Sequence, residues 1–460
     1  MKNHKTDVLI IGFGKAGKTL APFLAKQGLS VTVVEQSAQM YGGTCINVGC
    51  IPTKALAHQS HLFSQQDIHD PEARQEKYVQ AIREKDELVS LLRAKNFDQV
   101  NNQPGVTVMT GKASFQSAHK VEVQSQEGSI LVEADRIFIN TGAKPVIPEI
   151  PGIDSDKVYT SAEILDLAKL PKRLAIIGGG YIGLEYASIY AGFGSEVAIL
   201  EHGDQFLPKD DRDMAAEVRK VLEQKGIQIR LQTRVDRIDD QGLEEVTLHL
   251  SSPNGLEEWK ADAVLVATGR KANTDELNLE AAGIQRTARG FIQVDEKLRT
   301  NLSHIWALGD VNGGPQFTYI SLDDFRIVKD QWFGSGKRTT LDRKQVPYSV
   351  FIDPPLSHVG LTEAEARKQG YNVQVAKLPV TASTRARQLK QTEGLLKAVV
   401  DADTGLLLGF TMFGVESSEV VNIVSVFMNS GQPYTVLRDT IFTHPSMSEI
   451  LNDLLGLISG

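Results

Sequence analysis

Two segments of the chain carry the same pattern: a short apolar strand, a glycine-rich turn, a helix, and a second strand that ends at an acidic residue. The first segment begins DVLIIGFGKAGKTLAPFLAKQG, and the second begins RLAIIGGGYIGLEYASIYAGFG. The glycines and closing acids share one spacing, and they are Gly12, Gly14, Gly17 and Glu35 in the first segment and Gly178, Gly180, Gly183 and Glu201 in the second. The chain is therefore expected to contain two copies of one βαβ unit.

This pattern is typical of dinucleotide binding. One glycine makes the tight turn, the second lets the backbone approach a pyrophosphate, and the third packs helix against strand. The helix N-terminus then faces the phosphates, and the acidic residue accepts hydrogen bonds from a ribose. A lone GxGxxG is weak evidence, but each of these lies between a predicted strand and a predicted helix. Two such units in register favour two bound dinucleotides.

Cys45 and Cys50 are the only cysteines in the sequence, and they lie in GGTCINVGCIPTK after the first unit. A disulfide between them would close a short loop, so it would remove little entropy from the unfolded chain. Short, constrained disulfides are easily reduced and often catalytic. The alternative is two buried thiols, because free cysteine packs as a small hydrophobe. The flanking nucleotide units favour a redox pair.

Composition excludes several classes of function. The chain has 460 residues, enough for about three domains. Its net charge of −8 argues against nucleic acid or an anionic membrane as a partner. Acidic clusters such as KDDRD at 209–213 are interpreted as solvated faces. No apolar stretch is long enough for a membrane span, and the N-terminal apolar run leads straight into a glycine turn, unlike a signal peptide. A thiol pair without an export signal predicts a cytoplasmic protein.

The order of patterns along the chain predicts an interrupted first domain. The region from about 55 to 100 has helical spacing and is expected to form two helices. Two similar TG turns end strands on either side of the second unit, and three prolines near residue 148 mark a stiff crossing. The predicted domains are 1–148, 149–270, 271–344, which resumes the first, and 345–460.

The motifs together resemble the class I pyridine nucleotide-disulfide oxidoreductases, the family of glutathione reductase, dihydrolipoamide dehydrogenase and mercuric reductase. The resemblance rests on GGTCxNxGCxPTK, the TG turns, ALGD near residue 310 and THPSMSE near residue 446. It implies an α/β fold with two Rossmann-like domains, for FAD and NAD(P), plus a C-terminal α+β dimerisation domain. Within the family, MYGGTCINVGCIPTK and FTYISLDDFRIV resemble bacterial flavoproteins of reactive-chlorine resistance that reduce hypothiocyanous acid.

The resemblance also assigns roles to single residues. The first glycine unit would hold FAD and the second the nicotinamide nucleotide. Cys50 would be the thiol beside the flavin, and Cys45 the exposed interchange thiol. Lys54 would lie by the flavin and pair with Glu185. The remaining implied cofactor contacts are Gly43, Thr44, Thr141, Gly142, Gly269 and Asp310, with Tyr181 gating the nicotinamide pocket. His444 and Glu449 would form an acid/base pair that reaches into the partner's active site, so a homodimer is expected.

Several of these residues also have ordinary explanations. On sequence alone Lys54 is a surface lysine, and Tyr181 is an aromatic that packs. Glu185 lies on an apolar helix face and needs a partner if buried, which independently favours its pairing with Lys54. His444 is one of ten histidines, but Glu449 lies close enough in sequence to orient its imidazole.

The sequence favours NADH over NADPH. A carboxylate at Glu201 accepts hydrogen bonds from ribose hydroxyls and repels a 2′-phosphate, which would require arginine. The first arginine after Glu201 is Arg212.

The predicted activity passes electrons from NAD(P)H through FAD to Cys45 and Cys50, and on to a small oxidant, with hypothiocyanous acid favoured and no metal cofactor required. The chain lacks the additional cysteines of mercuric and large thioredoxin reductases. The open alternatives are a dihydrolipoamide dehydrogenase, a Cu(II) or metal-ion reductase, and a flavin redox sensor without turnover. The sequence gives no account of SLDDFRIV at 321–328, which would line the disulfide pocket or pack an interface.

Overall fold

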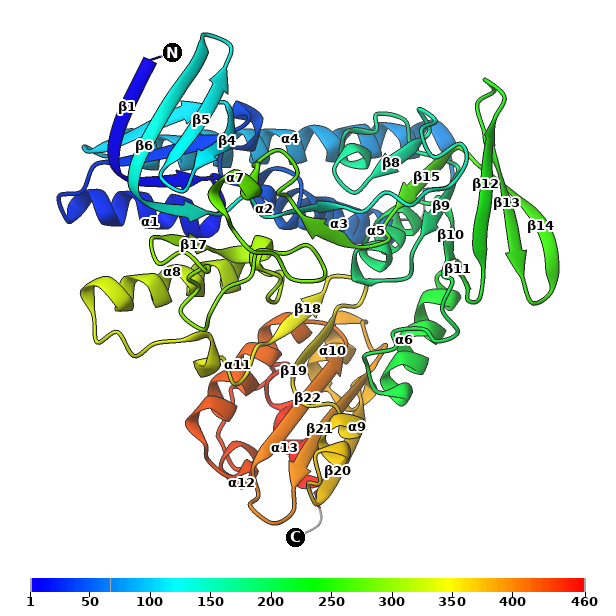
Figure 1. Ribbon diagram of the computed structural model, residues 1–460. Coiled ribbons are helices and arrows are strands. Elements are labelled where there is room, and N and C mark those ends of the chain that lie inside the picture. Colours follow the sequence, from blue (N-terminus) through cyan, green and yellow to red (C-terminus); the bar gives the residue numbers. More distant parts are fainter. Residues whose placement is uncertain (1, 67, 459–460) are drawn as a thin grey trace.

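The N-terminal βαβ unit forms part of a seven-stranded sheet (Figure 1). In the computed structural model, which describes residues 2–66 and 68–458, the strand order is β3-β2-β1-β6-β5-β4, and β17 pairs with β6. Strands β1, β2, β3, β6 and β17 pair in parallel, and β4 and β5 add an antiparallel hairpin. The strands are β1 (Lys2–Ile11), β2 (Val31–Glu35), β3 (Val106–Thr110), β4 (Lys112–Ser117), β5 (Lys120–Ser125), β6 (Gly128–Ile139) and β17 (Ile305–Ala307).

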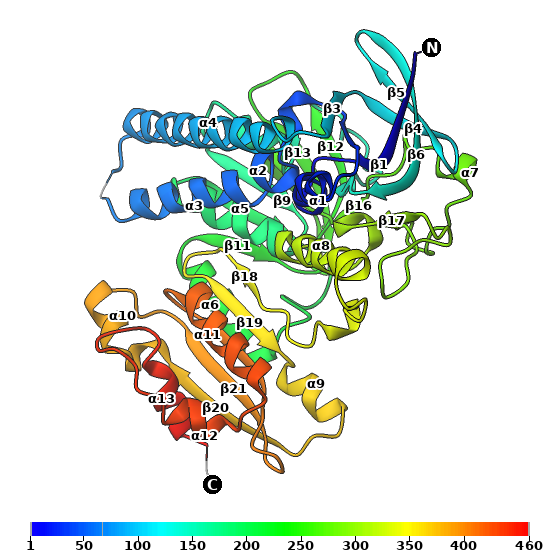
Figure 2. The same ribbon diagram turned by 90° about the vertical axis from the view of Figure 1, so that its left-hand side faces the viewer.

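Helices cover this sheet and extend from it toward the second unit. Helix α3 packs against α4 and also against α5 of the second unit, as Figure 2 shows. The region predicted to form two helices is confirmed as α3 and α4, although α3 begins at the second cysteine. The helices are α1 (Lys15–Lys26), α2 (Thr44–Asn47), α3 (Cys50–Ser64), α4 (Pro71–Asn101), α7 (Leu279–Ala282) and α8 (Thr318–Phe333).

The second βαβ unit forms a separate parallel sheet with the order β11-β10-β9-β15-β8. A three-stranded antiparallel sheet, β12-β13-β14, packs beside it and projects from the molecule (Figure 1). The elements are β8 (Val158–Thr160), β9 (Arg173–Ile177), α5 (Tyr181–Gly192), β10 (Glu196–Leu200), α6 (Arg212–Gln224), β11 (Ile227–Arg230), β12 (Arg234–Asp240), β13 (Val246–Ser252), β14 (Gly255–Ala261) and β15 (Ala263–Val266).

The chain leaves the first sheet and returns to it at adjacent points. Short strands β7 (Ala143–Pro145) and β16 (Arg270–Ala272) pair antiparallel, so the two TG turns lie next to each other. After this crossing, β17 joins β6 of the first sheet. We keep the predicted domain boundaries as a proposal, namely 1–148, 149–270, 271–344 and 345–460.

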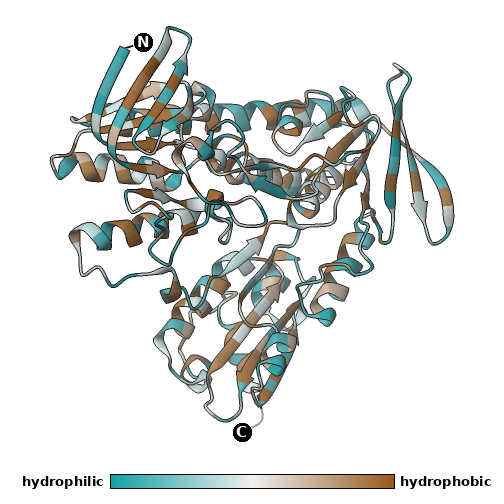
Figure 3. Cartoon of the chain, viewed as in Figure 1, coloured by the Kyte–Doolittle hydropathy of each residue, from teal (hydrophilic) through white to brown (hydrophobic). Residues whose placement is uncertain are grey.

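The C-terminal part is an antiparallel sheet of order β18-β19-β22-β21-β20 with helices packed on it. Figure 3 shows strands β21 and β22 as largely hydrophobic, consistent with a buried sheet. The α/β fold class with a C-terminal α+β domain is confirmed. The elements are β18 (Tyr348–Val350), β19 (Leu356–Gly360), α9 (Glu363–Lys368), β20 (Val373–Pro379), α10 (Thr384–Leu389), β21 (Leu395–Asp401), β22 (Leu407–Phe413), α11 (Ser417–Ser430), α12 (Tyr434–Arg438) and α13 (Ile450–Gly456).

The three parts share one hydrophobic core. Leu56 of α3, Tyr186 of α5 and Val350 of β18 all belong to a single cluster of buried side chains. Because apolar burial is the main favourable term in folding, this shared cluster holds the parts in a fixed relation around α3. Within the described ranges, no helix combines the length and apolar character needed to cross a bilayer.

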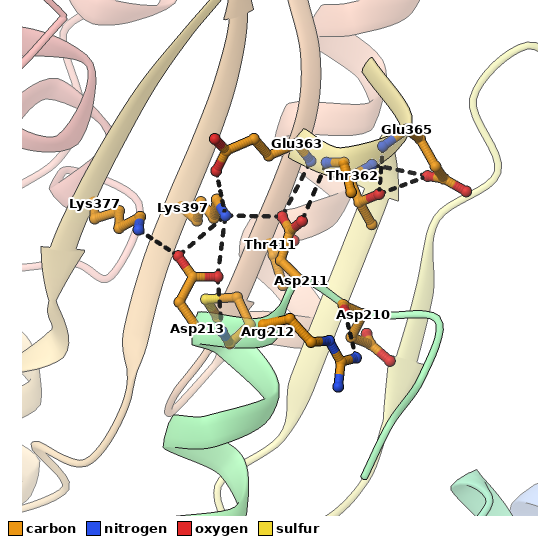
Figure 4. Close-up of polar contacts among 12 residues, drawn as sticks. Asp210, Asp211, Arg212, Asp213, Thr362, Glu363, Glu365, Lys377, Lys397 and Thr411 are labelled. Atoms are coloured by element: carbon orange, nitrogen blue, oxygen red, sulfur yellow. Dashed lines mark hydrogen bonds and ion pairs between the residues drawn. The ribbon is translucent and has the colours of Figure 1, made fainter. Parts of the chain in front are cut away.

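The KDDRD segment is not the solvated face predicted from its charge. Asp210 and Asp211 are both buried. Asp211 and Asp213 lie 3.0 Å from the ammonium of Lys397 on β21, and Glu363 of α9 lies 2.8 Å from it (Figure 4). The prediction was wrong because these carboxylates meet a buried cation that lies far away in the sequence.

The SLDDFRIV segment, residues 321–328, lies within helix α8. Its side chains connect α1 to the loop at Gly309. The hydroxyl of Ser321 accepts a hydrogen bond from the amide of Ala16, at 3.1 Å. The fully buried carboxylate of Asp324 accepts from the amide of Gly309 at 2.6 Å and pairs with Arg343. The segment thus fixes the position of the loop that precedes Asp310.

Lys397 and Lys377 both pair with Asp213, but only Lys397 is buried, with 3% of its side chain exposed against 46% for Lys377. We expect Lys397→Met to lower the free energy of unfolding by about 3 kcal/mol, because it leaves the buried carboxylate of Asp211 without a counter-charge. Lys377→Met should lower it by less than about 1 kcal/mol. Urea unfolding of the two variants measures the difference. Equal losses in the free energy of unfolding would contradict the stabilising role assigned to the buried Lys397.

Candidate active site

The two cysteines lie at the start of two consecutive helices. Cys45 is in the first turn of α2, and Cys50 is the first residue of α3. In the structure both are free cysteines, and their contacts describe the dithiol arrangement of the expected redox pair. The two side chains are hydrogen bonded to each other, and the hydroxyl of Thr318 lies 3.8 Å from the Cys50 sulfur. The starts of α2 and α3 thus place the two sulfurs within hydrogen-bonding distance of each other.

The pair divides its charge unequally. The hydrogen bond from Cys45 and the nearby Lys54 ammonium lower the pKa of Cys50 to about 6, although burial opposes them. The same hydrogen bond, together with burial, raises the pKa of Cys45 well above its usual value. At neutral pH Cys50 is therefore a thiolate, and Cys45 holds the shared proton.

The two cysteines differ in exposure. Cys50 is exposed and Cys45 is half-buried. Cys50, at the N-terminus of α3, lies close enough to Arg270 for their charges to interact, and Asp310 interacts with the same guanidinium. This is the side on which FAD is expected.

Lys54 and Glu185 form an ion pair next to the cysteines. Their charged atoms are 2.6 Å apart, and the Glu185 side chain is 13% exposed. The other oxygen of Glu185 accepts from the amide of Phe351 at 2.8 Å, and the Lys54 ammonium lies 4.8 Å from the Phe351 ring centre. The predicted partners are thus brought together, and a third contact comes from the C-terminal part.

The first glycine turn is closed by its carboxylate. Glu35 accepts a hydrogen bond from the amide of Phe13 at 2.9 Å, and burial raises its pKa to about 6. A Cβ at Gly12 would lie 2.4 Å from a backbone oxygen, and one at Gly43 would lie 2.8 Å from the Cα of Gly14. Larger residues are therefore excluded from this turn, as a close approach of backbone to a pyrophosphate requires.

The second glycine turn has the same construction. Glu201 accepts from the amide of Gly179 at 2.7 Å, the counterpart of the Phe13 contact, and from the amide of Gly203 at 2.7 Å. A Cβ at Gly183 would lie 2.3 Å from the oxygen of Gly178, whereas a Cβ at Gly180 would meet nothing within 4 Å. Gly180 therefore faces open space, where a bound nucleotide would approach.

The expected FAD side contains one unpaired polar atom. The Thr141 hydroxyl is buried without a hydrogen-bond partner, one of two such side-chain atoms among the described residues. A Cβ at Gly142 would lie 4.0 Å from the Thr44 hydroxyl, so these residues border the same space. A buried hydroxyl without a partner is costly, which fits a site built to bind a polar cofactor. Asp310 lies near the guanidinium of Arg270. Gly269, directly before Arg270, has open space at its Cβ position.

Asn140 is a site residue that the sequence analysis missed. Its side-chain oxygen accepts from the amide of Gly17 at 2.9 Å, and its amide donates to the carbonyl of Leu308 at 2.6 Å. It thereby fixes the first glycine turn against the loop before Asp310. A polar residue directly after the apolar strand RIFI was the available signal.

Tyr181 is the first residue of α5, and its ring stacks on that of Tyr348 with centres 5.4 Å apart. Both hydroxyls donate to the carboxylate of Asp210, at 3.1 Å each. The sequence analysis missed Asp210 and Tyr348, because they come from the predicted solvated segment and from the C-terminal part.

His444 and Glu449 lie together but away from the cysteines. The His444 Nδ1 is 2.9 Å from the Glu449 carboxylate, and 67% of the histidine side chain is exposed. Both border a pocket of about 190 Å³. Figures 1 and 2 both show the segment between α12 and α13 well separated from α2 and α3. One chain therefore does not bring this pair to its own thiols.

Known proteins match nearly the whole length of the chain. The chain matches the family described as "Pyridine nucleotide-disulphide oxidoreductase" over residues 6–324 and its "dimerisation domain" over residues 346–455. It is 49% identical to "Probable pyridine nucleotide-disulfide oxidoreductase RclA" of Escherichia coli K12, covering 99% of this chain and 100% of that protein. It is 33% identical to a "Dihydrolipoyl dehydrogenase" of Bacillus subtilis 168, covering 97% and 95%.

A solved structure shows the same similarity. It is titled "Cu(II) complex of HOCl-induced flavoprotein disulfide reductase RclA from Escherichia coli". Its TM-score to this chain is 0.94 at 49% identity, covering 99% of this chain and 100% of that one.

Gly180→Ala and Gly178→Ala separate nucleotide binding from folding. A Cβ at position 180 meets no atom within 4 Å, while one at 178 would lie 2.6 Å from the Ala267 oxygen. We expect Gly180→Ala to keep the wild-type melting temperature and to weaken NAD⁺ binding by about tenfold or more. Gly178→Ala should lower the melting temperature. Calorimetric titration and thermal unfolding measure the two effects, and unchanged NAD⁺ affinity in Gly180→Ala would contradict the assignment of this turn.

The charge of Cys50 predicts a pH dependence. Because its pKa is about 6, the thiolate should form as pH rises through about 6 and be lost below it. Lys54→Met should move this transition to higher pH, since it removes a neighbouring positive charge. Ultraviolet absorbance of the reduced protein follows the thiolate, with Lys26→Met, an exposed lysine at the far end of α1, as a control. An unshifted transition in Lys54→Met would contradict the proposed cause.

Proposed function

The chain belongs to the pyridine nucleotide-disulfide oxidoreductase family, and we propose that it uses NADH and FAD to reduce hypothiocyanous acid to thiocyanate through Cys45 and Cys50. The family's enzymes depend on FAD and a pyridine nucleotide. The observation that carries the proposal is a pair of hydrogen-bonded cysteines, of which Cys50 is the thiolate and Cys45 the thiol. This pair lies beside the Lys54–Glu185 ion pair, between two glycine turns. The choice of acceptor is supported by full-length similarity to a flavoprotein whose title describes it as HOCl-induced.

The residues of the first unit fit FAD. Gly12, Gly14 and Gly43 allow a pyrophosphate to approach the backbone, and the unpaired Thr141 hydroxyl is available to hydrogen bond to it. Thr44, Gly142 and Asp310 would complete this side. When bound, FAD supplies the transfer of a hydride equivalent from NADH to the cysteine pair.

The two thiols then act in sequence. Cys45 attacks the electrophilic sulfur of hypothiocyanous acid, forming a sulfur–sulfur bond as the hydroxyl group leaves. The Cys45 proton passes by way of His444 of the partner subunit to this hydroxyl, which departs as water. The Cys50 thiolate next attacks the Cys45 sulfur and expels thiocyanate, which restores the disulfide. One NADH is oxidised for each hypothiocyanous acid, giving NAD⁺, thiocyanate and water.

The order of these two steps matches the protonation states of the two cysteines. Cys45 carries the proton that the leaving hydroxyl needs, and Cys50 carries the charge that the second attack needs. Lys54 keeps the negative charge of Cys50 stable between the two steps, and Glu185 orients Lys54. His444 is oriented by Glu449 in the same way.

A homodimer would supply the missing imidazole. The match to the dimerisation domain covers residues 346–455, which include His444 and Glu449. Large apolar side chains on this part are exposed, with Ile441 at 97% and Val426 at 74%. Exposed apolar side chains of this size are typical of a surface that another subunit covers. We infer that each active site combines the cysteines of one subunit with His444 of the other.

NADH is the proposed electron donor, and the neighbouring arginines support this choice. Arg212 donates to backbone carbonyls, among them those of Phe206 at 2.9 Å and Asp210 at 2.6 Å. Arg230 pairs with Glu257. Both guanidinium groups are thus occupied, and Glu201 would repel a 2′-phosphate. We also propose a cytoplasmic location, where thiols are kept reduced.

Cu(II) is a second candidate acceptor, because the similar structure is a Cu(II) complex. Cysteine sulfur is a good ligand for copper. Among the described residues, no group of three or more His, Cys, Asp or Glu side chains is placed to hold a metal ion. Because its sulfurs can ligate copper, the thiol pair is the proposed place of Cu(II) reduction, with its two electrons reducing two Cu(II) ions to Cu(I). Dihydrolipoamide and a sensor without turnover stay as alternatives.

NADH oxidation by the FAD-loaded protein tests the acceptor. Hypothiocyanous acid, lipoamide, oxidised glutathione and Cu(II) are offered separately to wild type, Cys45→Ser and Cys50→Ser, and loss of NADH absorbance is followed. We expect fast turnover with hypothiocyanous acid in wild type and a loss of about 100-fold or more in each variant, because both thiols are needed. Turnover with lipoamide alone would contradict the proposal, and no turnover with any acceptor would favour the sensor. Light scattering of the same samples reports the dimer.

A further inference from the structure

Asp210 holds two tyrosine hydroxyls with one carboxylate. Tyr181 donates to one oxygen and Tyr348 to the other, at 3.1 Å each, and the two hydroxyls lie 3.1 Å apart. Asp210 is only 6% exposed, and burial raises its pKa. Neither tyrosine nor Asp210 takes part in the thiol chemistry described above, so this cluster of two partly exposed tyrosines on a buried carboxylate needs its own explanation.

The tyrosine pair lies between the nucleotide turn and the thiols. Tyr181 directly follows Gly180, whose Cβ position faces open space, and Glu185 lies one helical turn further along α5. The ring of Tyr348 stacks on Phe317 with centres 6.4 Å apart. Phe317 precedes Thr318, which is 3.8 Å from the Cys50 sulfur. A nucleotide bound at Gly180 and extending toward Cys50 must therefore pass these rings.

We propose that Asp210 is a positioning residue that latches Tyr181 and Tyr348 closed over the nicotinamide end of the nucleotide site. Opening the pair for NADH breaks the hydroxyl–carboxylate hydrogen bond of Tyr181 and its stacking on Tyr348. Because a protein that is mostly closed binds its ligand with reduced affinity, this contact weakens the observed binding of nucleotide. The proposal rests on the second glycine turn binding the nucleotide, as proposed above.

The segment that carries Asp210 is anchored from the other side. In Figure 4 the carboxylates of Asp211 and Asp213 turn toward Lys397, and that of Asp210 turns away from it. Glu363, on the C-terminal part, binds the same ammonium at 2.8 Å. Arg212 further fixes the segment by donating to the Asp210 carbonyl at 2.6 Å. The latch therefore has a rigid base, so the tyrosines are the elements that move.

Nucleotide affinity of the FAD-loaded protein tests the latch. NAD⁺ is titrated calorimetrically into wild type, Asp210→Ala, Tyr348→Phe and Glu223→Gln, and melting temperatures are recorded alongside. We expect NAD⁺ to bind Asp210→Ala about tenfold more tightly, since a hydrogen bond to a charged group no longer opposes opening. Tyr348→Phe keeps the ring and should change the affinity less, in the same direction. Glu223→Gln removes an exposed charge that pairs with Arg219 at the far end of α6, away from both the tyrosines and the Lys397 anchor, and should leave the affinity unchanged.

The direction of the change separates a latch from a purely structural role. A structural role lowers the melting temperature and leaves NAD⁺ affinity unchanged or weaker, which would overturn the proposal. If Asp210→Ala does not fold, Tyr348→Phe decides by the same criterion. Lack of NAD⁺ binding by wild type would overturn the nucleotide assignment and the latch together. Absence of turnover with hypothiocyanous acid alone would overturn only the proposed acceptor.

Discussion

The ion pair between Lys54 and Glu185 joins the three parts of the molecule at the reactive thiols. Lys54 lies one turn after Cys50 on α3, and Glu185 lies on α5 of the second βαβ unit. The remaining oxygen of Glu185 binds the amide of Phe351, at the start of the C-terminal part. Even a partly buried ion pair stabilises a fold only when its other hydrogen bonds are satisfied, and here they come from a different part of the chain. The charge on Cys50 therefore depends on the correct packing of all three.

The sequence predicted the nucleotide turns well because their physics is local. A glycine pattern between a strand and a helix specifies the turn, and the acid after the second strand follows at a fixed distance. The structure adds that Glu35 and Glu201 each bind an amide of their own turn through one oxygen. The carboxylate predicted to recognise ribose is thus also the group that closes the turn. That second task was invisible because it depends on side-chain direction and not on spacing.

The predictions that failed concern residues whose partners are distant in sequence. Charge alone made the 209–213 segment look solvated, yet Asp211 lies 3.0 Å from Lys397, which is buried on a strand nearly two hundred positions later. Asn140 connects a helix start to a loop from the other end of the interrupted domain. A polar residue is predicted to be buried only when its partner is known, because the penalty for burial is offset by that partner. Local patterns carry no such information.

Fold and cofactors are shared across the family, so the acceptor must be selected by features outside the common core. The thiol pair places a proton on Cys45 and a charge on Cys50, an arrangement suited to an acceptor that brings its own leaving group. Hypothiocyanous acid meets this requirement twice, since hydroxyl leaves in the first step and thiocyanate in the second. A disulfide acceptor instead needs space for two substituents beside Cys45. The half-buried position of Cys45 therefore favours a small electrophile, in keeping with the proposed acceptor.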